Sequence, residues 1–187
     1  MSIALSGSLK TLSDFFRYSI NTIFYQRGIY PQDDFVFRKE YGISVVHCVN
    51  EELENFLSCF ILQLSKWLEE DAVRQIVLVV REDEEVLERW SFAVSLQYGC
   101  EEKPTEEIAK EIQAIVRQIT ASVTFLPVLP KCTFELLVYT DKEKLTSVPP
   151  DWTDSHAFII ENGENVKLRS FSTSIHKINA SVAYRIK

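Results

Sequence analysis

Apolar residues recur every three or four positions in three stretches of the chain, which is the spacing of helices with one buried face. The stretches cover residues 12–24, 53–68 and 108–119. The second is the most apolar and is predicted to be a central helix. The pattern therefore predicts three amphipathic helices spread along the chain.

Start and stop signals flank these stretches. Thr11 and Asp14 have the spacing of a capping box, which places the start of the first helix near Thr11. Gly28 follows its last apolar residues and is a typical stop signal. Asn50 precedes the second stretch, and the third helix is predicted to begin at Thr105.

Short β-type runs lie between the helices, at residues 35–37 and 43–49. Residues 75–81 form a continuous Ile/Val/Leu run, typical of a strand covered on both faces. Residues 87–96 alternate between large apolar and polar side chains, so these two runs are predicted to form an antiparallel hairpin. A further strand is predicted at residues 133–140.

The C-terminal part has no helical period and carries three β-type runs, at residues 157–161, 166–171 and 175–186. The order of elements is helix, strands, helix, hairpin, helix, strand and then a β-rich tail. This order predicts an α+β fold in which three helices pack on one mainly antiparallel sheet.

Length and composition narrow the function classes. The 187 residues fit one domain, and a formal net charge of −7 argues against broad binding to nucleic acid. The five glycines are scattered, so neither a P-loop nor a dinucleotide fingerprint is present. No apolar run approaches the length of a membrane span, and the N-terminus does not have the pattern of a signal peptide.

Candidate chemistry is sparse. The cysteines form no CxxC pair, so a zinc site is not predicted and reduced cysteines of an intracellular protein are expected. His47 and Cys48 are adjacent and would point to opposite faces of a strand, as a surface histidine and a core cysteine. His176 could be placed in a Ser/His/Asp triad only on paper, so no enzyme, cofactor or metal is expected. The cysteines are Cys48, Cys59, Cys100 and Cys132.

Six segments in a fixed order carry a resemblance to a known family. They are YQRGIYP at 25–31, ERWSF at 88–92, RQITASVTFLP at 117–127, YTDK at 139–142, LRSFSTSIHK at 168–177 and VAY at 182–184. Each is weak alone, but together they resemble the HORMA family in its mitotic-arrest-deficient, spindle-assembly-checkpoint branch. The resemblance covers nearly the whole chain.

The resemblance implies a non-enzymatic protein with a HORMA core and a mobile C-terminal "safety belt". In the closed state of the family the belt wraps a short partner peptide, which adds a strand to the sheet edge. In the open state the belt folds onto that same edge and blocks it. The implied boundaries are one domain over 1–187, with a core at 9–150 and a belt at 151–187.

The implied site residues form three groups. The edge strand that pairs with the peptide is Thr133, Phe134, Glu135, Leu136, Leu137, Val138 and Tyr139. The belt is represented by Trp152, Phe158, Leu168, Phe171, His176, Val182 and Tyr184. Arg117 and Gln118 match the helix positions at which an open and a closed copy pair. Trp152 is expected to pin one end of the belt, and Trp67, Trp90 and Phe125 to line the core or the groove.

The implied partners are a coiled-coil kinetochore checkpoint protein, the co-activator of the anaphase-promoting complex and a second copy of the chain. No nucleic acid or membrane partner is expected, and the implied location is the nucleus, the kinetochore and the cytoplasm. The alternatives are other HORMA adaptors, namely the translesion-polymerase accessory subunit or a meiotic axis protein. A Cys- or Ser-based hydrolase is the alternative from a different class.

Overall fold

A computed structural model describes residues 3–97 and 103–186 of the chain. Residues 98–102, which include Cys100, lie outside the described residues. The helices are α1 (Ile3–Arg27), η1 (Gln32–Asp34, a 3-10 turn), α2 (Glu51–Glu69) and α3 (Thr105–Ser122). The strands are β1 (Phe35–Glu40), β2 (Ile43–Cys48), β3 (Val73–Glu82), β4 (Glu85–Leu96), β5 (Thr133–Thr140), β6 (Glu164–Ser172) and β7 (His176–Tyr184).

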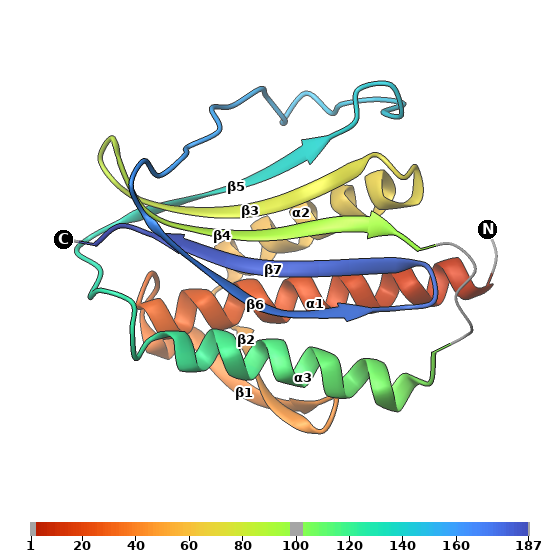
Figure 1. Cartoon of the computed structure of the whole chain (residues 1–187), viewed down its shortest axis with the longest axis horizontal. Helices are drawn as coiled ribbons and strands as arrows, with labels where there is room; N and C mark the ends of the chain where they lie inside the picture. The colour runs from red at the N-terminus through yellow and green to blue at the C-terminus, as the bar shows by residue number, and fades with distance from the viewer. Residues whose placement is uncertain (1–2, 98–102, 187) are drawn as a thin grey trace.

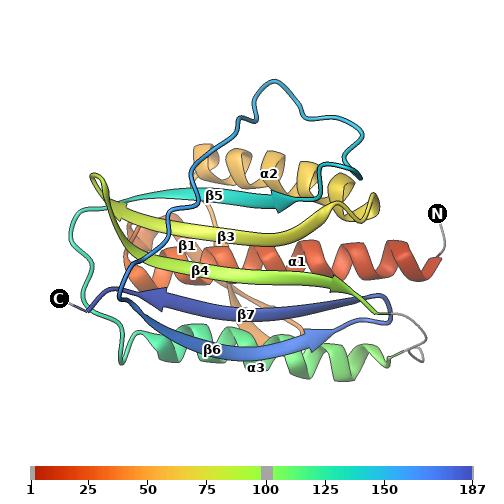
Figure 2. The same cartoon turned by 45° about the horizontal axis from the view of Figure 1, so that its top comes forward.

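Five strands form one antiparallel sheet in the order β5-β3-β4-β7-β6 (Figure 1). β1 and β2 pair separately as a two-stranded hairpin. The three long helices cover one face of the large sheet, and α1 lies between α2 and α3 (Figure 2). This arrangement confirms the predicted α+β fold and adds a small second sheet to it.

Aromatic packing between α1 and the sheet forms the centre of the core. Phe15 and Phe16 are fully buried and contact Phe92 of β4 edge-on, with ring centroids 5.8 and 6.0 Å apart. Phe15 also contacts Phe171 of β6 at 4.5 Å. Burial of such large side chains contributes roughly 1.5–3 kcal/mol each. The C-terminal hairpin is therefore part of the main core in this arrangement.

The predicted start of the first helix is wrong. α1 is already helical from Ile3, so Thr11 lies inside it and is not a cap. The Thr11 hydroxyl donates to the carbonyl of Gly7, 3.0 Å away, which satisfies this hydroxyl within the helix. A hydroxyl residue with an acidic residue three positions later can stand at a helix start or inside a helix, since Ser and Thr can also bond back to the preceding turn.

The predicted strand at residues 157–161 is also wrong. These residues have no strand partner, and Phe158 adopts a positive φ of 47°. Phe158 and Ile160 instead contact a small apolar cluster that contains Val77 and Val79 of β3, on the face opposite the helices. Their apolar character therefore reflects packing onto a sheet and not pairing within one.

Several side chains differ in burial from the sequence-based expectation. Cys59 lies within the apolar stretch 53–68 but is exposed, because it is not on the buried face of α2. His47 is half-buried against Tyr18, with ring centroids 5.4 Å apart, and is not a free surface histidine. Phe125 is 43% exposed, whereas Trp67 and Trp90 are buried as expected.

One buried ion pair joins α1 to β4. The side chains of Arg27 and Glu88 are 5% and 1% exposed, and Arg27 Nη2 lies 2.5 Å from Glu88 Oε1. Arg27 also donates to the carbonyl of Pro127, and Trp90 Nε1 donates to Glu88 Oε2 at 3.0 Å. The pair thus ties the end of α1, the sheet and the α3–β5 connection together.

Glu88→Gln is expected to lower the free energy of unfolding by about 3–5 kcal/mol, because it leaves the buried Arg27 guanidinium without a countercharge. Urea unfolding followed by circular dichroism measures the change. The matched control is Glu85→Gln, which removes an exposed pair with Arg185 and should cost under about 1 kcal/mol. Equal effects of the two substitutions would contradict the role of the buried pair.

Candidate functional site

β5 is an edge strand with one free side. It pairs with β3 along its whole length and, within residues 3–97 and 103–186, with no other strand. None of its residues is fully buried, although most are apolar. The predicted edge residues 133–139 thus lie on a strand whose outward backbone groups have no strand partner, the usual template for an added strand.

An apolar surface continues from β5 onto α2. Phe134 contacts Phe24 at 4.6 Å and Phe56 at 5.9 Å between ring centroids. Phe56 lies within the apolar stretch 53–68 of the helix pattern but is 47% exposed. Leu136 and Val138 pack partly against the main core. The free edge therefore has an apolar wall beside it that alternate side chains of an added strand would contact.

The connection between β5 and β6 rises past β5 and returns across the sheet (Figure 2). About midway along it, Trp152 stacks on Phe60 of α2 at 5.5 Å and meets Trp67 edge-on at 4.6 Å between ring centroids. Trp67 Nε1 donates to the carbonyl of Ser147 at 3.1 Å. Trp152 is thus seated on α2, and its role in pinning one end of the belt stays a prediction.

The β5–β6 connection also contacts the sheet at a second place, on the face opposite the helices. The Arg81 guanidinium lies 4.8 Å from the ring centroid of Phe158. Tyr139 Oη donates to the carbonyl of Ala157 at 3.2 Å and accepts from Arg89 at 3.0 Å. Tyr139 thus contacts this segment through its side chain, in addition to belonging to β5.

The last two strands are built into the sheet, with β7 paired to β4 and β6. Phe171 and Val182 are fully buried, and Leu168 is half-buried against the core. Tyr184 Oη donates to Glu164 at 2.9 Å, and its ring contacts Phe125. The predicted belt residues therefore lie on both sides of the sheet, at the connection and in the β6–β7 hairpin.

Side chains of α3 cover the outer edge of β6. Gln118 Oε1 accepts a hydrogen bond from the backbone N–H of Arg169 at 2.5 Å, at a bulge in β6. Glu111 Oε2 accepts from the N–H of Ser172 at 3.0 Å, and Lys103 bonds both residues. Gln118 thus faces the hairpin, a contact that the sequence pattern does not signal.

Arg117, the neighbour of Gln118, points elsewhere. It is exposed and lines a hollow between α3 and the β1–β2 hairpin, together with Gly42, Ile43 and Ser44. The two residues assigned to one dimer face therefore lie in different surroundings. Only Arg117 is free to meet a second protein in this arrangement without giving up a hydrogen bond to β6.

A buried polar cluster joins the start of α1 to the β6–β7 turn. Ser8 Oγ lies 2.7 Å from Thr173 Oγ1 and 2.8 Å from His176 Nδ1. Ser8 is 4% and His176 2% exposed, so both side chains lie inside the packed interior. Burial lowers the pKa of His176, an effect that the Asp71 carboxylate partly offsets. Sequence reasoning missed Ser8 because its partners lie far along the chain.

Among residues 3–97 and 103–186, no group of three His, Cys, Asp or Glu side chains is placed to hold a metal ion. Within the same ranges no helix has both the length and the apolar character needed to cross a bilayer.

Comparisons with known proteins agree with this geometry. The HORMA domain model matches residues 8–176. The "Mitotic spindle assembly checkpoint protein MAD2A" of Dictyostelium discoideum is 47% identical, with 98% of this chain and 94% of the relative aligned. The human protein of the same name is 42% identical over 98% and 93%. A chain of a solved structure titled "Crystal Structure of Mitotic Checkpoint Complex" superposes with a TM-score of 0.89 and 44% identity, covering 97% of this chain and all of that one.

The alternative HORMA branch matches far less well. The "DNA polymerase zeta processivity subunit" of Arabidopsis thaliana is 24% identical over 70% of this chain and 62% of its own length. The match to checkpoint proteins is therefore both closer and longer than the match to the polymerase subunit.

His176→Asn tests the buried cluster through pH. The folded-state pKa of His176 is lowered, so folding excludes its proton, and stability falls as pH drops below the ordinary histidine value of about 6.5. Asparagine can still accept from Ser8 but does not titrate. Between pH 7.5 and 5.5 the wild type should lose more unfolding free energy than the variant, by at most about 1.4 kcal/mol per pH unit. If urea titrations show that the unfolding free energies of the wild type and the variant fall equally between pH 7.5 and 5.5, the prediction is wrong.

Proposed function

This chain belongs to the HORMA-domain family, in its MAD2 spindle-checkpoint branch, and we propose that it captures short partner peptides on the free edge of β5 beneath its C-terminal belt. It acts in the mitotic spindle assembly checkpoint, together with other checkpoint components. The observation that carries the proposal is the unpaired, apolar edge of β5, with the β5–β6 connection fastened on either side of it.

Edge pairing alone would bind a peptide modestly. Each backbone hydrogen bond nets only about 0.5–1.5 kcal/mol, and a short segment makes few of them. Apolar side chains that face Phe56, Leu136 and Val138 would add buried area. A belt that encloses the peptide acts mainly on the rate of release, where most affinity differences between related complexes arise.

The strand order supports a closed arrangement of the belt. The β6–β7 hairpin pairs with β4, on the side of the sheet away from β5, and leaves the β5 edge free. In an open arrangement the belt would occupy that edge. Conversion between the two would break the pairing of β7 with β4 and unseat Phe171 and Val182 from the core, so we expect exchange to be slow.

We further propose which proteins supply the captured peptides. A coiled-coil kinetochore checkpoint protein and the co-activator of the anaphase-promoting complex would each supply a peptide, and sequestering the co-activator would delay anaphase. This activity is binding and not catalysis, consistent with relatives named as checkpoint proteins. We place the protein at the kinetochore in dividing cells, and in the nucleus and cytoplasm otherwise.

An open and a closed copy are proposed to pair through α3. Arg117 is exposed beside the β1–β2 hairpin and is available for such a contact. Gln118 accepts a hydrogen bond from β6 here, so its contribution to pairing would depend on the position of the hairpin.

Phe158→Ala tests belt enclosure. It removes the ring that contacts Arg81 and the cluster on the far face of the sheet, so a captured peptide should leave roughly tenfold faster, the equivalent of about 1.4 kcal/mol. Surface plasmon resonance with peptides tiled from the kinetochore partner measures the release rate. The matched control is Ile159→Ala, because this neighbour is 71% exposed and should leave release unchanged. Equally slow release from both variants would count against enclosure.

Arg117→Ala tests the pairing face. Self-association in analytical ultracentrifugation should weaken, while peptide release stays at the wild-type rate, since Arg117 lies on α3 and away from β5. An unchanged dimer population would exclude Arg117 from the pairing surface.

A further inference from the structure

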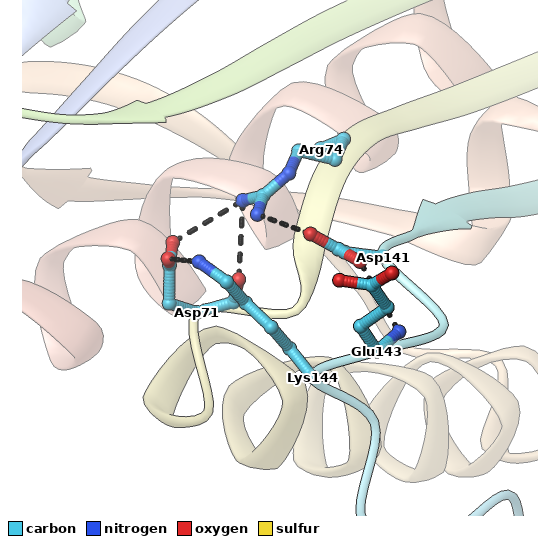
Figure 3. Close-up of polar contacts among 5 residues, drawn as sticks. All are labelled: Asp71, Arg74, Asp141, Glu143 and Lys144. Carbon is cyan, nitrogen blue, oxygen red and sulfur yellow. Dashed lines mark hydrogen bonds and ion pairs between the residues drawn. The ribbon is translucent and has the colours of Figure 1, made fainter.

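A cluster of ion pairs holds the chain where it leaves β5 (Figure 3). Arg74 Nη2 lies 2.8 Å from Asp141 Oδ2, and Arg74 Nη1 lies 3.3 Å from Asp71 Oδ1. Lys144 forms a further ion pair with Asp71. The cluster joins the turn between α2 and β3 to the first residues after β5, and we call these four residues the hinge clamp.

Within the hinge clamp, Asp141 and Arg74 shift each other's pKa in the directions expected for an ion pair. Hydrogen bonding by Arg74 lowers the pKa of Asp141, and the Asp141 bond is also the main cause that raises the pKa of Arg74. Both ionised forms are therefore favoured where they meet. These side chains are partly exposed, so salt screens their attraction.

Backbone contacts extend the attachment beyond the clamp. The N–H of Asp141 donates to the carbonyl of Ala72 at 2.7 Å, and the N–H of Thr146 donates to Glu70 at 3.2 Å. The carbonyl of Ser147 accepts from Trp67, and the ring of Trp152 stacks on α2. Residues 141–152 are thus tied to the end of α2 at successive points.

The attachment stops after Trp152. In the part of the chain that the structure describes, residues 153–155 are exposed and make no polar or ring contact with the core. The next fastening is at Ala157 and Phe158 on the far face of the sheet. Residues 141–152 are therefore held to the core at several points, whereas the residues directly after Trp152 are not.

We propose that the hinge clamp fixes residues 141–152 to the core as a static anchor, so that the belt that moves begins after Trp152. This inference rests on the proposed function, because it assigns the pivot of the same belt. The implied boundary between core and belt moves from residue 150 to residue 152. The anchor would hold the pivot beside the free edge of β5 in any position of the belt.

Arg74→Gln tests the clamp without any peptide. The substitution removes two ion pairs at an exposed position and keeps a polar side chain of similar length. Hydrogen exchange followed by mass spectrometry should show residues 141–152 exchanging roughly fivefold faster, with β3 and β7 unchanged, because local opening becomes easier. Raising NaCl from about 0.05 M to about 1 M should shift wild-type exchange in the same direction through screening.

Glu85→Gln is the matched control, because it removes a similarly exposed ion pair between the β3–β4 turn and the end of β7. It should leave residues 141–152 as protected as in the wild type. Unchanged protection of residues 141–152 in Arg74→Gln would overturn the proposal. So would wild-type exchange at 141–152 as fast as at 153–155, and this second readout does not depend on how the variant folds.

Addition of a captured peptide separates this inference from the proposed function. Binding should slow exchange at residues 153–163 and leave residues 141–152 as they were. If no peptide binds but Arg74→Gln exposes residues 141–152, the capture function fails and the anchor stands. If peptide binds and residues 141–152 change protection together with 153–163, the anchor fails and capture stands.

Discussion

The outward backbone groups of an edge strand need partners, and this sheet meets that constraint differently at its two edges. At β6, α3 supplies the partners, because Gln118 and Glu111 accept from successive points of the strand. At β5, the edge is left unpaired and flanked by apolar side chains. One edge is thus closed by the protein itself and the other is left open, which is why we propose β5 as the point of peptide capture.

The belt follows from the same constraint. In the proposed function the β5–β6 connection controls access to the free edge, and it contacts the rest of the protein near both of its ends. In its first half the hinge clamp and Trp152 attach it to α2, and at its far end Phe158 sits against Arg81 on the opposite face of the sheet. Beyond that point the chain enters the sheet as β6 and β7, so any release of the belt is coupled to the main core.

The sequence pattern predicted those elements of the fold that depend on residues close together in the chain. The apolar period of α2 and the alternation in β4 located both elements, and Asn50 caps α2 by accepting from the N–H of Leu53. The start of α1 was missed because the hydroxyl of Thr11 bonds within a helix as readily as it caps one. The apolar residues at 157–161 predict a strand, but Phe158 and Ile160 are apolar for a different reason, namely their packing on β3.

The candidate site could be predicted only in part, because its contacts join residues far apart in sequence. The resemblance to the family directed attention to β5 and to Trp152, whereas no pattern indicated that Gln118 would bond Arg169 or that Arg74 would meet Asp141. Such pairs depend on the relative position of whole elements, which a local reading does not provide.

The central claim is that a partner peptide becomes a strand beside β5. Amide-resolved NMR hydrogen exchange on β5, with and without a bound peptide, tests this most directly. The account predicts that alternate amides of residues 133–140, those that point away from β3, become strongly protected in the complex. Tight binding that leaves all of these amides exchanging at their free rate would contradict it.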